Sequence, residues 1–406
     1  MKVTLINHSD TLGGASVVTF RLMEALRLAG VDARMLVARR ASDSPHVVRA
    51  AGRFATAVPF LREHLRIFTH NGFNRDDLFK VSIADVGLPL HRHPLVTGAD
   101  AIILNWVNQG MLSLDEIGLI ARAKPTVWTM HDMWNLTGVC HHAGTCTRYT
   151  DACGCCPLLH SAAGAADLSA TTFARKTALY SGSPIHFVAV SRWLADLAAK
   201  SALTRNFPVE VIHCPMPVSQ LSDAPSMTRA EAGLPAAGRL VVMCAARLDD
   251  PVKNLPDAVE ALNALAGTDA VAVFVGDIRD SSVLGRLEIP FVQTGPVYDA
   301  ARLRSIFAYA SAVLSSSRYE SFGATLLEGQ TLGAVPVAYV HDGRSDIIDD
   351  GITGYAAGPR IRPLGDALRL ALERPLDRTQ LLGAAARYSY ETVAARYIDL
   401  LGRIAR

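Results

Sequence analysis

Short apolar runs alternate with longer amphipathic segments along most of the chain. The segment 14–29 places Val18, Leu22 and Leu26 on one helix face, so it predicts a helix. The short runs are rich in β-branched residues and predict strands; in the first half of the chain these are residues 2–7, 33–37, 101–104, 126–130 and 186–190. Strands that alternate with helices predict a parallel sheet covered on both faces.

A second set of strands begins near residue 238, at residues 240–244, 270–275, 291–294, 312–314 and 335–338. Between the two sets lie residues 214–217, Cys-Pro-Met-Pro, and a polar run that extends to Arg229, where we expect the domain linker. The pattern therefore predicts a first domain over 1–216 and a second over 217–385. The segment 380–406 predicts a terminal helix.

Composition supports two cores and excludes some partners. Among the 406 residues half are hydrophobic, and 40 Lys and Arg against 38 Asp and Glu leave a net charge of +2. This balance provides no overall field that would recruit nucleic acid. No apolar run approaches the ~18 residues of a membrane span, and the first strand turns polar too soon for a signal peptide. We expect a cytoplasmic protein, and leave open a peripheral contact with the inner face of the cell membrane.

Two glutamates eight positions apart, Glu320 and Glu328, enclose a Phe-Gly step. The flanking pattern predicts a strand, a loop and then a helix that begins near Phe322 and Gly323, and such a helix terminus favours an anionic or polyhydroxyl ligand. Eight helical residues rise about 12 Å, whereas glycosidase carboxylates stand roughly 5–9.5 Å apart. The pair therefore fits the two ends of one extended ligand better than an acid/base couple on one bond.

This Glu-x7-Glu segment resembles the signature of glycosyltransferase family 4, whose members are retaining nucleotide-sugar enzymes. The resemblance implies the GT-B fold, in which two Rossmann-like α/β domains face each other across a cleft and the final helix, here 386–406, returns to the first domain. It implies that Glu320 and the backbone after it hold the donor sugar and phosphates, and that Glu328 holds the ribose hydroxyls. The donor residues implied are Glu320, Ser321, Phe322, Gly323, Ala324, Thr325 and Glu328.

Two loops that follow strands resemble phosphate-binding segments of this family. Arg247 and Lys253 stand six positions apart after the first strand of the second domain and would neutralise a diphosphate. Gly14 lies in a glycine-containing turn after the first strand of the chain, beside which the resemblance places the donor diphosphate. A plain strand-to-helix turn is the alternative there, because the segment lacks the dinucleotide fingerprint. No Asp-x-Asp pattern occurs, so we expect no catalytic metal.

His131 ends a predicted strand of the first domain, where ligands bind in open α/β sheets. The resemblance implies that His131 faces the donor sugar, while Asp132 either orients its ring or meets the acceptor. Two weaker segments, 275–277 and 294–297, match positions around the nucleotide base, and 341–346 resembles a glycine-rich loop of the family. All three are equally compatible with simple turns.

Five of the seven cysteines fall between residues 140 and 156. Clusters of this kind in cytosolic proteins bind metal more often than they form disulfides, and four thiolates suit tetrahedral Zn²⁺. We favour a structural Zn²⁺ on Cys140, Cys146, Cys153 and Cys156, with disulfides or free thiols as alternatives. His141 and His142 are alternative ligands. Similar Cys-rich inserts occur in a bacterial polysaccharide subset of the family.

The segment 49–75 holds five arginines and a single acid, Glu63. Phe54, Val58, Leu61, Leu65 and Phe68 recur in it at helical spacing. The stripe predicts either a surface for anionic lipid or a diphosphate-lipid acceptor, or a core-facing helix with solvated arginines.

Together these patterns predict a retaining glycosyltransferase that moves a sugar from a UDP- or GDP-sugar to a glycan or a polyprenyl-diphosphate-linked acceptor in cell-surface polysaccharide synthesis. His131, Arg247, Lys253 and Glu320 are the expected catalytic residues. A GT-B-like nucleotide-sugar epimerase and a non-catalytic nucleotide-sugar-binding subunit remain the alternatives. The base, the sugar, the acceptor and the oligomeric state have no legible signal in the sequence.

Overall fold

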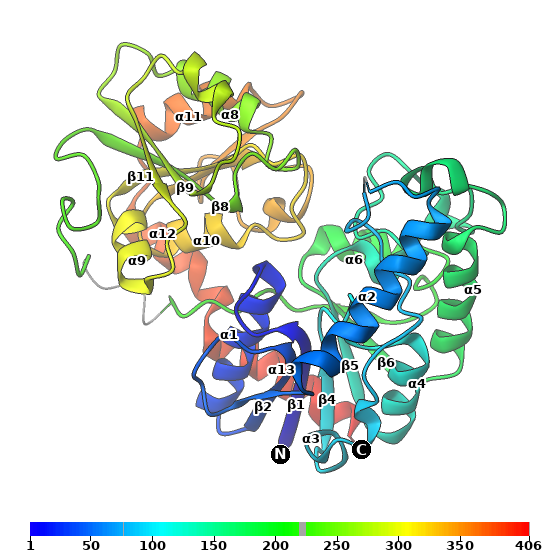
Figure 1. Cartoon of the computed structure of the whole chain (residues 1–406). Coiled ribbons are helices and arrows are strands. Elements are labelled where there is room, and N and C mark those ends of the chain that lie inside the picture. Colours follow the sequence, from blue (N-terminus) through cyan, green and yellow to red (C-terminus); the bar gives the residue numbers. More distant parts are fainter. Residues whose placement is uncertain (76, 219–224, 406) are drawn as a thin grey trace. The chain divides into compact units, whose positions relative to one another are not determined.

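The computed structural model describes residues 1–75, 77–218 and 225–405. The chain divides into two compact units (Figure 1): unit 1 comprises Met1–Pro215 and Val393–Arg406, and unit 2 comprises Met216–Thr392. Residues 219–224, within the segment predicted as the linker, lie outside the described residues. Each unit contains one parallel sheet with Rossmann-like topology, so the predicted α/β fold class is confirmed.

Unit 1 holds a seven-stranded sheet among its described residues, in the order β3-β2-β1-β4-β5-β6-β7. The strands are β1 (Lys2–Ser9), β2 (Asp32–Arg39), β3 (Val47–Arg49), β4 (Ala101–Leu104), β5 (Thr126–Met130), β6 (Ile185–Ala189) and β7 (Val209–Val211). Its helices are α1 (Gly14–Leu28), α2 (Arg53–His70), α3 (Pro94–Thr97), α4 (Leu114–Ala123), α5 (Leu168–Ser181), α6 (Arg192–Lys200) and most of α13 (Tyr390–Ile404). All four residues of β4 are buried, as expected of a central strand covered on both faces.

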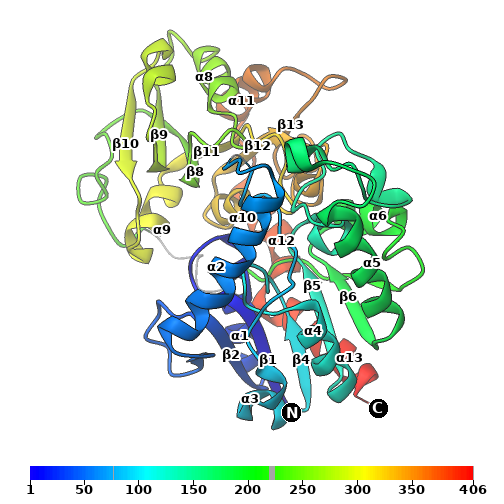
Figure 2. The same cartoon turned by 45° about the vertical axis from the view of Figure 1, so that its right-hand side comes forward.

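Unit 2 repeats this design with a six-stranded sheet in the order β10-β9-β8-β11-β12-β13 (Figure 2). Its strands are β8 (Arg239–Arg247), β9 (Ala270–Asp277), β10 (Phe291–Gly295), β11 (Ala310–Ser315), β12 (Val335–Tyr339) and β13 (Tyr355–Ala357). Its helices are α8 (Leu255–Asn263), α9 (Ala300–Ala308), α10 (Ala324–Thr331), α11 (Leu364–Glu373) and α12 (Arg378–Ala385). One continuous apolar core joins α8 and α11 to the strands.

Both sheets reverse their winding at one point, between β1 and β4 in unit 1 and between β8 and β11 in unit 2. In open α/β sheets the crevice outside the carboxyl ends of the strands at such a point binds ligands. The topology therefore marks one candidate position in each unit before any side chain is considered.

The chain's last segment corrects one expectation, because 380–406 is not a single helix. α12 ends at Ala385, a 3-10 turn covers Ala386–Tyr388, and α13 starts at Tyr390. The Ser389 hydroxyl accepts a hydrogen bond from the Thr392 N–H and so caps the new helix. The Tyr388 carbonyl accepts the Met216 N–H at 2.7 Å, which brings the two ends of unit 2 side by side.

The helix α13 is attached to the sheet of unit 1. The Tyr397 hydroxyl and the Thr129 hydroxyl on β5 form a buried hydrogen bond of 2.9 Å. Near the end of the helix, Arg403 forms an ion pair with Glu210 on β7 at 2.8 Å. Within the described residues, no helix combines the length and the apolar character that a transmembrane segment requires.

Replacement of Tyr397 by Phe tests this attachment. The change leaves the Thr129 hydroxyl without its partner in a dry environment, so we expect a loss of about 1 kcal/mol in the free energy of unfolding. Urea denaturation of the whole chain, followed by circular dichroism, measures the difference. The matched control is Tyr298→Phe, because Tyr298 is exposed; equal midpoints for the two variants would contradict the structural role given to Tyr397.

Candidate functional site

The loops after β8 and β11 are joined at the switch point of unit 2. The Arg318 N–H donates to the Val252 carbonyl at 2.8 Å. The Ser316 hydroxyl donates to the carbonyls of Lys253 and Asn254 at 2.7 and 3.0 Å. These bonds hold the two loops that carry most of the residues expected to bind the donor.

Lys253 and Glu320 meet across these two loops. The Lys253 Nζ lies 2.6 Å from the Glu320 Oε1, which also accepts a hydrogen bond of 2.8 Å from the Ser317 hydroxyl. The two side chains are 28% and 24% exposed, so the pair is accessible to a ligand. Burial alone would raise the pKa of Glu320, but Lys253, Ser317 and Arg344 outweigh it and hold this pKa below its ordinary value. Glu320 is therefore a carboxylate at neutral pH.

A fully buried ion pair between Asp342 and Arg344 holds the loop that carries Glu320. Arg344 donates from Nε and Nη2 to both oxygens of Asp342 at 2.8 and 2.7 Å, and the two side chains are 0% and 1% exposed. The second oxygen of Asp342 also accepts the Glu320 N–H at 2.7 Å. Gly343 lies between them, and a Cβ there would come within 2.1 Å of the Ser321 carbonyl oxygen. The segment 341–346, compatible with a simple turn in the sequence, thus positions Glu320.

Arg247 is the last residue of β8, just before the loop that carries Lys253, and has a different partner. Its Nε is 3.1 Å from the Asp249 Oδ1, and the arginine side chain is 42% exposed. The other oxygen of Asp249 accepts the Asp280 N–H at 3.2 Å. The structure thus places Arg247 at the end of β8 and Lys253 on the following loop, and it brings Lys253, rather than Arg247, to Glu320.

The helix α10 starts beside this pair. Gly323 adopts a left-handed conformation with φ of 96° and precedes the first helical residue, Ala324. The Gly323 carbonyl accepts hydrogen bonds from the N–H groups of Leu326 and Leu327. The N–H groups that precede Leu326 therefore form the N-terminus of the helix. Phe322 is buried and packs edge-on against Tyr388, so only its backbone is available to a donor.

Ser321, Ala324, Thr325 and Glu328 are half-buried around this terminus. The Glu328 carboxylate and the Lys253 ammonium both influence the Cys244 thiol on β8. Burial, reinforced by Glu328, raises the pKa of Cys244 to about 12. Glu328 and Lys253 therefore lie near the same strand end, as a ligand that reaches both would require.

In unit 1, the ends of β4 and β5 place His131 against Asn105. The His131 Nε2 lies 3.0 Å from the Asn105 Oδ1. Burial lowers the pKa of His131 to about 4, against an opposing effect of Asp132. The imidazole is therefore neutral at neutral pH and can exchange hydrogen bonds but not carry a positive charge. Asn105 had no distinguishing signal in the sequence, since an Asn after a short strand is common.

Asp132 orients a different histidine. Its Oδ2 accepts hydrogen bonds from the Trp106 indole at 2.9 Å and from His141 Nδ1 at 2.8 Å, and its Oδ1 accepts the Trp134 N–H. His141, which the sequence offered only as an alternative metal ligand, thus joins the end of β5. One of the two roles left open for Asp132 was to orient the His131 ring. Among the described hydrogen bonds, none joins Asp132 to His131, so this role has no support.

Gly14 begins α1, directly after the carboxyl end of β1. A Cβ at Gly13 or Gly14 would meet no atom within 4 Å, so the backbone there is open to a ligand. Gly13 alone requires glycine on conformational grounds, because its φ is 93°.

Four of the clustered cysteines surround one small cavity. Cys140, Cys146, Cys153 and Cys156 line a space of about 20 Å³, close to the volume of a single water-sized particle. All seven cysteines are free thiols, and burial raises the pKa of Cys140 and Cys156 to about 11. No three of the described His, Cys, Asp and Glu side chains are placed to hold a metal ion as they stand. The four thiols thus share one cavity without metal-ligand geometry among them, and Zn²⁺ stays a prediction.

A buried lysine supports the start of the cysteine segment. The Lys176 ammonium on α5 donates to the carbonyls of Trp134 and Thr137 at 2.5 and 3.0 Å and lies 3.4 Å from the centre of the Trp134 ring. Among the described residues it forms no ion pair with a carboxylate. The Gly138 N–H, next along the chain, donates to the Cys153 sulfur at 3.2 Å.

The lowered pKa of Glu320 leads to a pH-dependent stability. A carboxylate whose pKa falls on folding stabilises the protein above its unfolded pKa, and this stabilisation is lost as the pH falls through the folded value. Glu320→Gln should therefore lower the free energy of unfolding at pH 7 and have progressively less effect toward pH 3. Urea unfolding across this range measures the difference, with the exposed Glu373→Gln as control. A deficit that does not vary with pH would contradict the assignment.

Metal analysis of the purified chain tests the zinc prediction. We expect one Zn²⁺ per chain by mass spectrometry of the eluted metal, and loss of that metal in Cys153→Ser, because structural zinc needs all four ligands. Cys155→Ser is the matched control, since Cys155 lies in the same segment but is exposed and does not line the cavity. The prediction would be contradicted if Cys153→Ser retained zinc. It would also be contradicted if the wild-type chain, produced in medium that contains zinc, held no zinc.

Curated relatives match only part of the chain. Glycogen synthase from Xanthomonas campestris pv. campestris (strain 8004) is 31% identical over 118 residues, which are 27% of this chain and 24% of that protein. Glycogen synthase from Xanthomonas oryzae pv. oryzae (strain PXO99A) is 33% identical over 89 residues, which cover 22% and 17% of the two chains. The match thus spans about a quarter or less of the length of these relatives.

Solved structures resemble the chain over nearly its whole length. Anabaena Alr3699/HepE in complex with UDP and glucose has a TM-score of 0.62 and 17% identity, covering 99% of this chain and all of that one. Sucrose-phosphate synthase from Thermosynechococcus elongatus has a TM-score of 0.65 and 16% identity, covering 100% and 99%. WaaG, a glycosyltransferase involved in lipopolysaccharide biosynthesis, has a TM-score of 0.62 and 15% identity, covering 98% and 99%. At these identities the likeness establishes the GT-B fold.

A family match covers the part of unit 2 that contains the switch-point loops. Residues 229–388 match the family described as Glycosyl transferases group 1. This range includes Arg247, Lys253, Glu320 and Glu328, and it ends at Tyr388, against which Phe322 packs. The match to this family therefore covers most of unit 2 and no residue of unit 1.

Proposed function

We propose that the protein is a retaining glycosyltransferase that moves a sugar from a UDP- or GDP-sugar to a glycan or lipid-linked acceptor in cell-surface polysaccharide synthesis. The observation that carries the proposal is the accessible Lys253–Glu320 pair at the switch point, beside the start of α10. Support comes from the matched family and from the Alr3699/HepE structures, solved with UDP and with UDP-glucose.

Unit 2 takes the donor in this proposal. Lys253 and Arg247 bind the diphosphate, and the backbone from Ser321 to Thr325 at the terminus of α10 contributes N–H donors. Glu320 accepts hydrogen bonds from the sugar hydroxyls, and Glu328 accepts them from the ribose. Before the donor arrives, Glu320 balances the Lys253 charge at 2.6 Å, so the lysine is already aimed at the loop edge where the phosphate would lie.

Transfer breaks the bond between the anomeric carbon and the diphosphate oxygen and forms a bond to the acceptor oxygen on the same face. The acceptor hydroxyl proton passes to the departing phosphate oxygen, so no separate base is needed. Negative charge grows on the diphosphate during this step. Fixed cations and N–H groups that stabilise this charge contribute most of the rate enhancement in such reactions.

Unit 1 contributes neutral hydrogen-bonding groups and an open turn. The family resemblance assigns His131, held by Asn105, to the donor sugar, and a neutral imidazole can exchange a hydrogen bond with a sugar hydroxyl. Gly14 offers backbone that a phosphate can approach closely. We expect no catalytic metal in this scheme, because Lys253, Arg247 and the helix terminus supply the compensating charge.

A ligand panel combined with two variants tests the proposal. We expect UDP or GDP, and the matching nucleotide sugars, to raise the melting temperature. Glu328→Ala should weaken nucleotide affinity by about 10- to 100-fold, because it removes charge-assisted hydrogen bonds. Lys253→Ala should chiefly lower turnover, by about 10²- to 10³-fold. Isothermal titration and an acceptor-dependent transfer assay measure the two effects.

The exposed Glu373→Ala is the control for both variants. Failure of both UDP and GDP to stabilise the protein, while another ligand class succeeds, would overturn the proposal. Sugar inversion without an acceptor would favour a nucleotide-sugar epimerase instead. Binding without turnover by the wild type would favour a non-catalytic subunit.

A further inference from the structure

A pocket of about 440 Å³ opens at the carboxyl ends of β1, β2 and β3 in unit 1. This volume falls within the roughly 300–1,000 Å³ of ordinary ligand pockets. Four arginines line it, Arg39, Arg40, Arg49 and Arg53, and no acidic residue does. The proposed donor site in unit 2 uses none of these residues.

The four arginines are exposed, and two of them have contacts that do not involve a carboxylate. Arg40 donates to the carbonyls of Ser42 and Ser44 at 3.0 and 3.1 Å, and the Arg39 guanidinium lies 5.9 Å from the centre of the Phe60 ring. Among the described residues, none of the four forms an ion pair. Guanidinium groups gathered without a counter-charge favour an anion, and their planar forks match phosphate oxygens.

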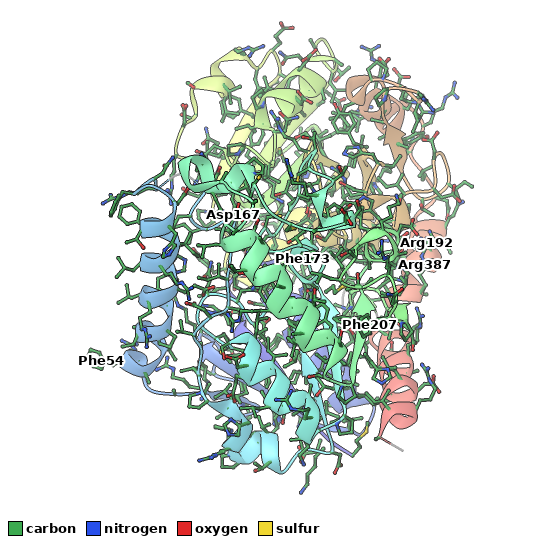
Figure 3. All side chains as sticks on the ribbon, turned by 90° about the vertical axis from the view of Figure 1, so that its right-hand side faces the viewer. Phe54, Asp167, Phe173, Arg192, Phe207 and Arg387 are labelled. Carbon is green, nitrogen blue, oxygen red and sulfur yellow. The ribbon has the colours of Figure 1, made fainter. Side chains whose placement is uncertain are left out.

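The helix that forms one wall of this pocket carries an exposed apolar stripe. Phe54 is 90% exposed, and Val58, Leu61 and Leu65 on the same face are all more than half exposed. Figure 3 shows Phe54 at the outer edge of α2, directed away from the sheet. Four of the five positions of the stripe predicted from the sequence are therefore turned to solvent and do not face the core, whereas the fifth, Phe68, is half-buried. Leu61 belongs both to the stripe and to the pocket lining.

The opposite face of α2 is fixed to the body of unit 1. The Glu63 carboxylate accepts the N–H groups of Ile83, Ala84 and Gly110, each at 2.8 Å. A Cβ on Gly110 would lie 2.4 Å from the Phe60 nitrogen, so the helix packs directly on that backbone. These contacts prevent α2 from turning its stripe inward, which leaves four large apolar side chains facing outward beside a cationic pocket.

Apolar side chains next to unpaired arginines are the features of a surface that rests on an anionic bilayer. We propose that the arginine pocket binds the phosphate group of a membrane lipid while Phe54, Val58, Leu61 and Leu65 enter the boundary between headgroups and acyl chains. This inference rests on the proposed function, for which it names the acceptor class: a lipid phosphate or diphosphate presented by the membrane. The phosphate enters from the bilayer side, since Leu61 connects pocket and stripe.

Vesicle co-sedimentation of the whole chain tests the proposal. Vesicles of phosphatidylcholine alone should bind weakly, vesicles with phosphatidylglycerol more tightly, and vesicles with phosphatidic acid, which exposes a phosphate monoester, most tightly. Arg49→Gln with Arg53→Gln should weaken binding to phosphatidic acid vesicles by about 30-fold, at about fivefold for each arginine. Leu61→Ser with Leu65→Ser should weaken binding to all vesicles by about tenfold or more.

Matched controls are Arg92→Gln and Leu28→Ser, exposed residues of unit 1 away from α2. Equal binding to phosphatidylglycerol and phosphatidic acid, or unchanged binding by the double arginine variant, would overturn the pocket assignment. Absence of vesicle binding together with stabilisation by inorganic pyrophosphate would show that the pocket serves a soluble phosphate and would overturn the lipid proposal. UDP binding is measured separately, so either failure is distinguishable from failure of the proposed function.

Discussion

The buried ion pair of Asp342 and Arg344 is the constraint on which the site in unit 2 depends. One carboxylate holds both the arginine fork and the Glu320 N–H, and the intervening glycine lets Ser321 pack against the turn. Loss of one member would leave the other charged and buried, which costs about 3–5 kcal/mol in comparable cases. Glu320 and the terminus of α10 are thus set in place before any ligand binds. A fixed arrangement of this kind is what stabilisation of a growing charge requires.

The two sheets have related topologies, but the residues at their switch points differ in chemistry. At the switch point of unit 2, opposite charges on adjacent loops form an accessible ion pair, which we propose to meet the phosphate and the sugar of the donor. At the switch point of unit 1, a neutral histidine is held by an amide, and a second histidine is held by Asp132. The arginine pocket lies at the carboxyl ends of β1, β2 and β3 of the same sheet. The two ligands that we propose, a sugar nucleotide and a lipid phosphate, are thus assigned to different sheets.

The strands and the position of Glu320 could be predicted because they depend on local pattern. Short apolar runs between helices mark a covered parallel sheet, and a Glu before a Phe-Gly step marks a loop that enters a helix. The pairing of Asn105 with His131 could not be predicted, because the two residues meet only after β4 and β5 become neighbours. The exposure of the apolar stripe of α2 could not be predicted either, because helical periodicity is the same whether the apolar face is buried or exposed to solvent. The break before α13 depends on a Ser389 cap and on Met216, which is distant in sequence.

The return of the final helix to the first sheet has a consequence for the order in which the contacts of unit 1 can form. Tyr397 and Arg403 contact β5 and β7, which are synthesised more than 190 residues earlier. Unit 2 is complete once Thr392 has been added, whereas unit 1 still lacks its last helix at that stage. The strands of unit 1 are synthesised first, but they gain the contacts of Tyr397 and Arg403 only after the whole of unit 2 has been synthesised.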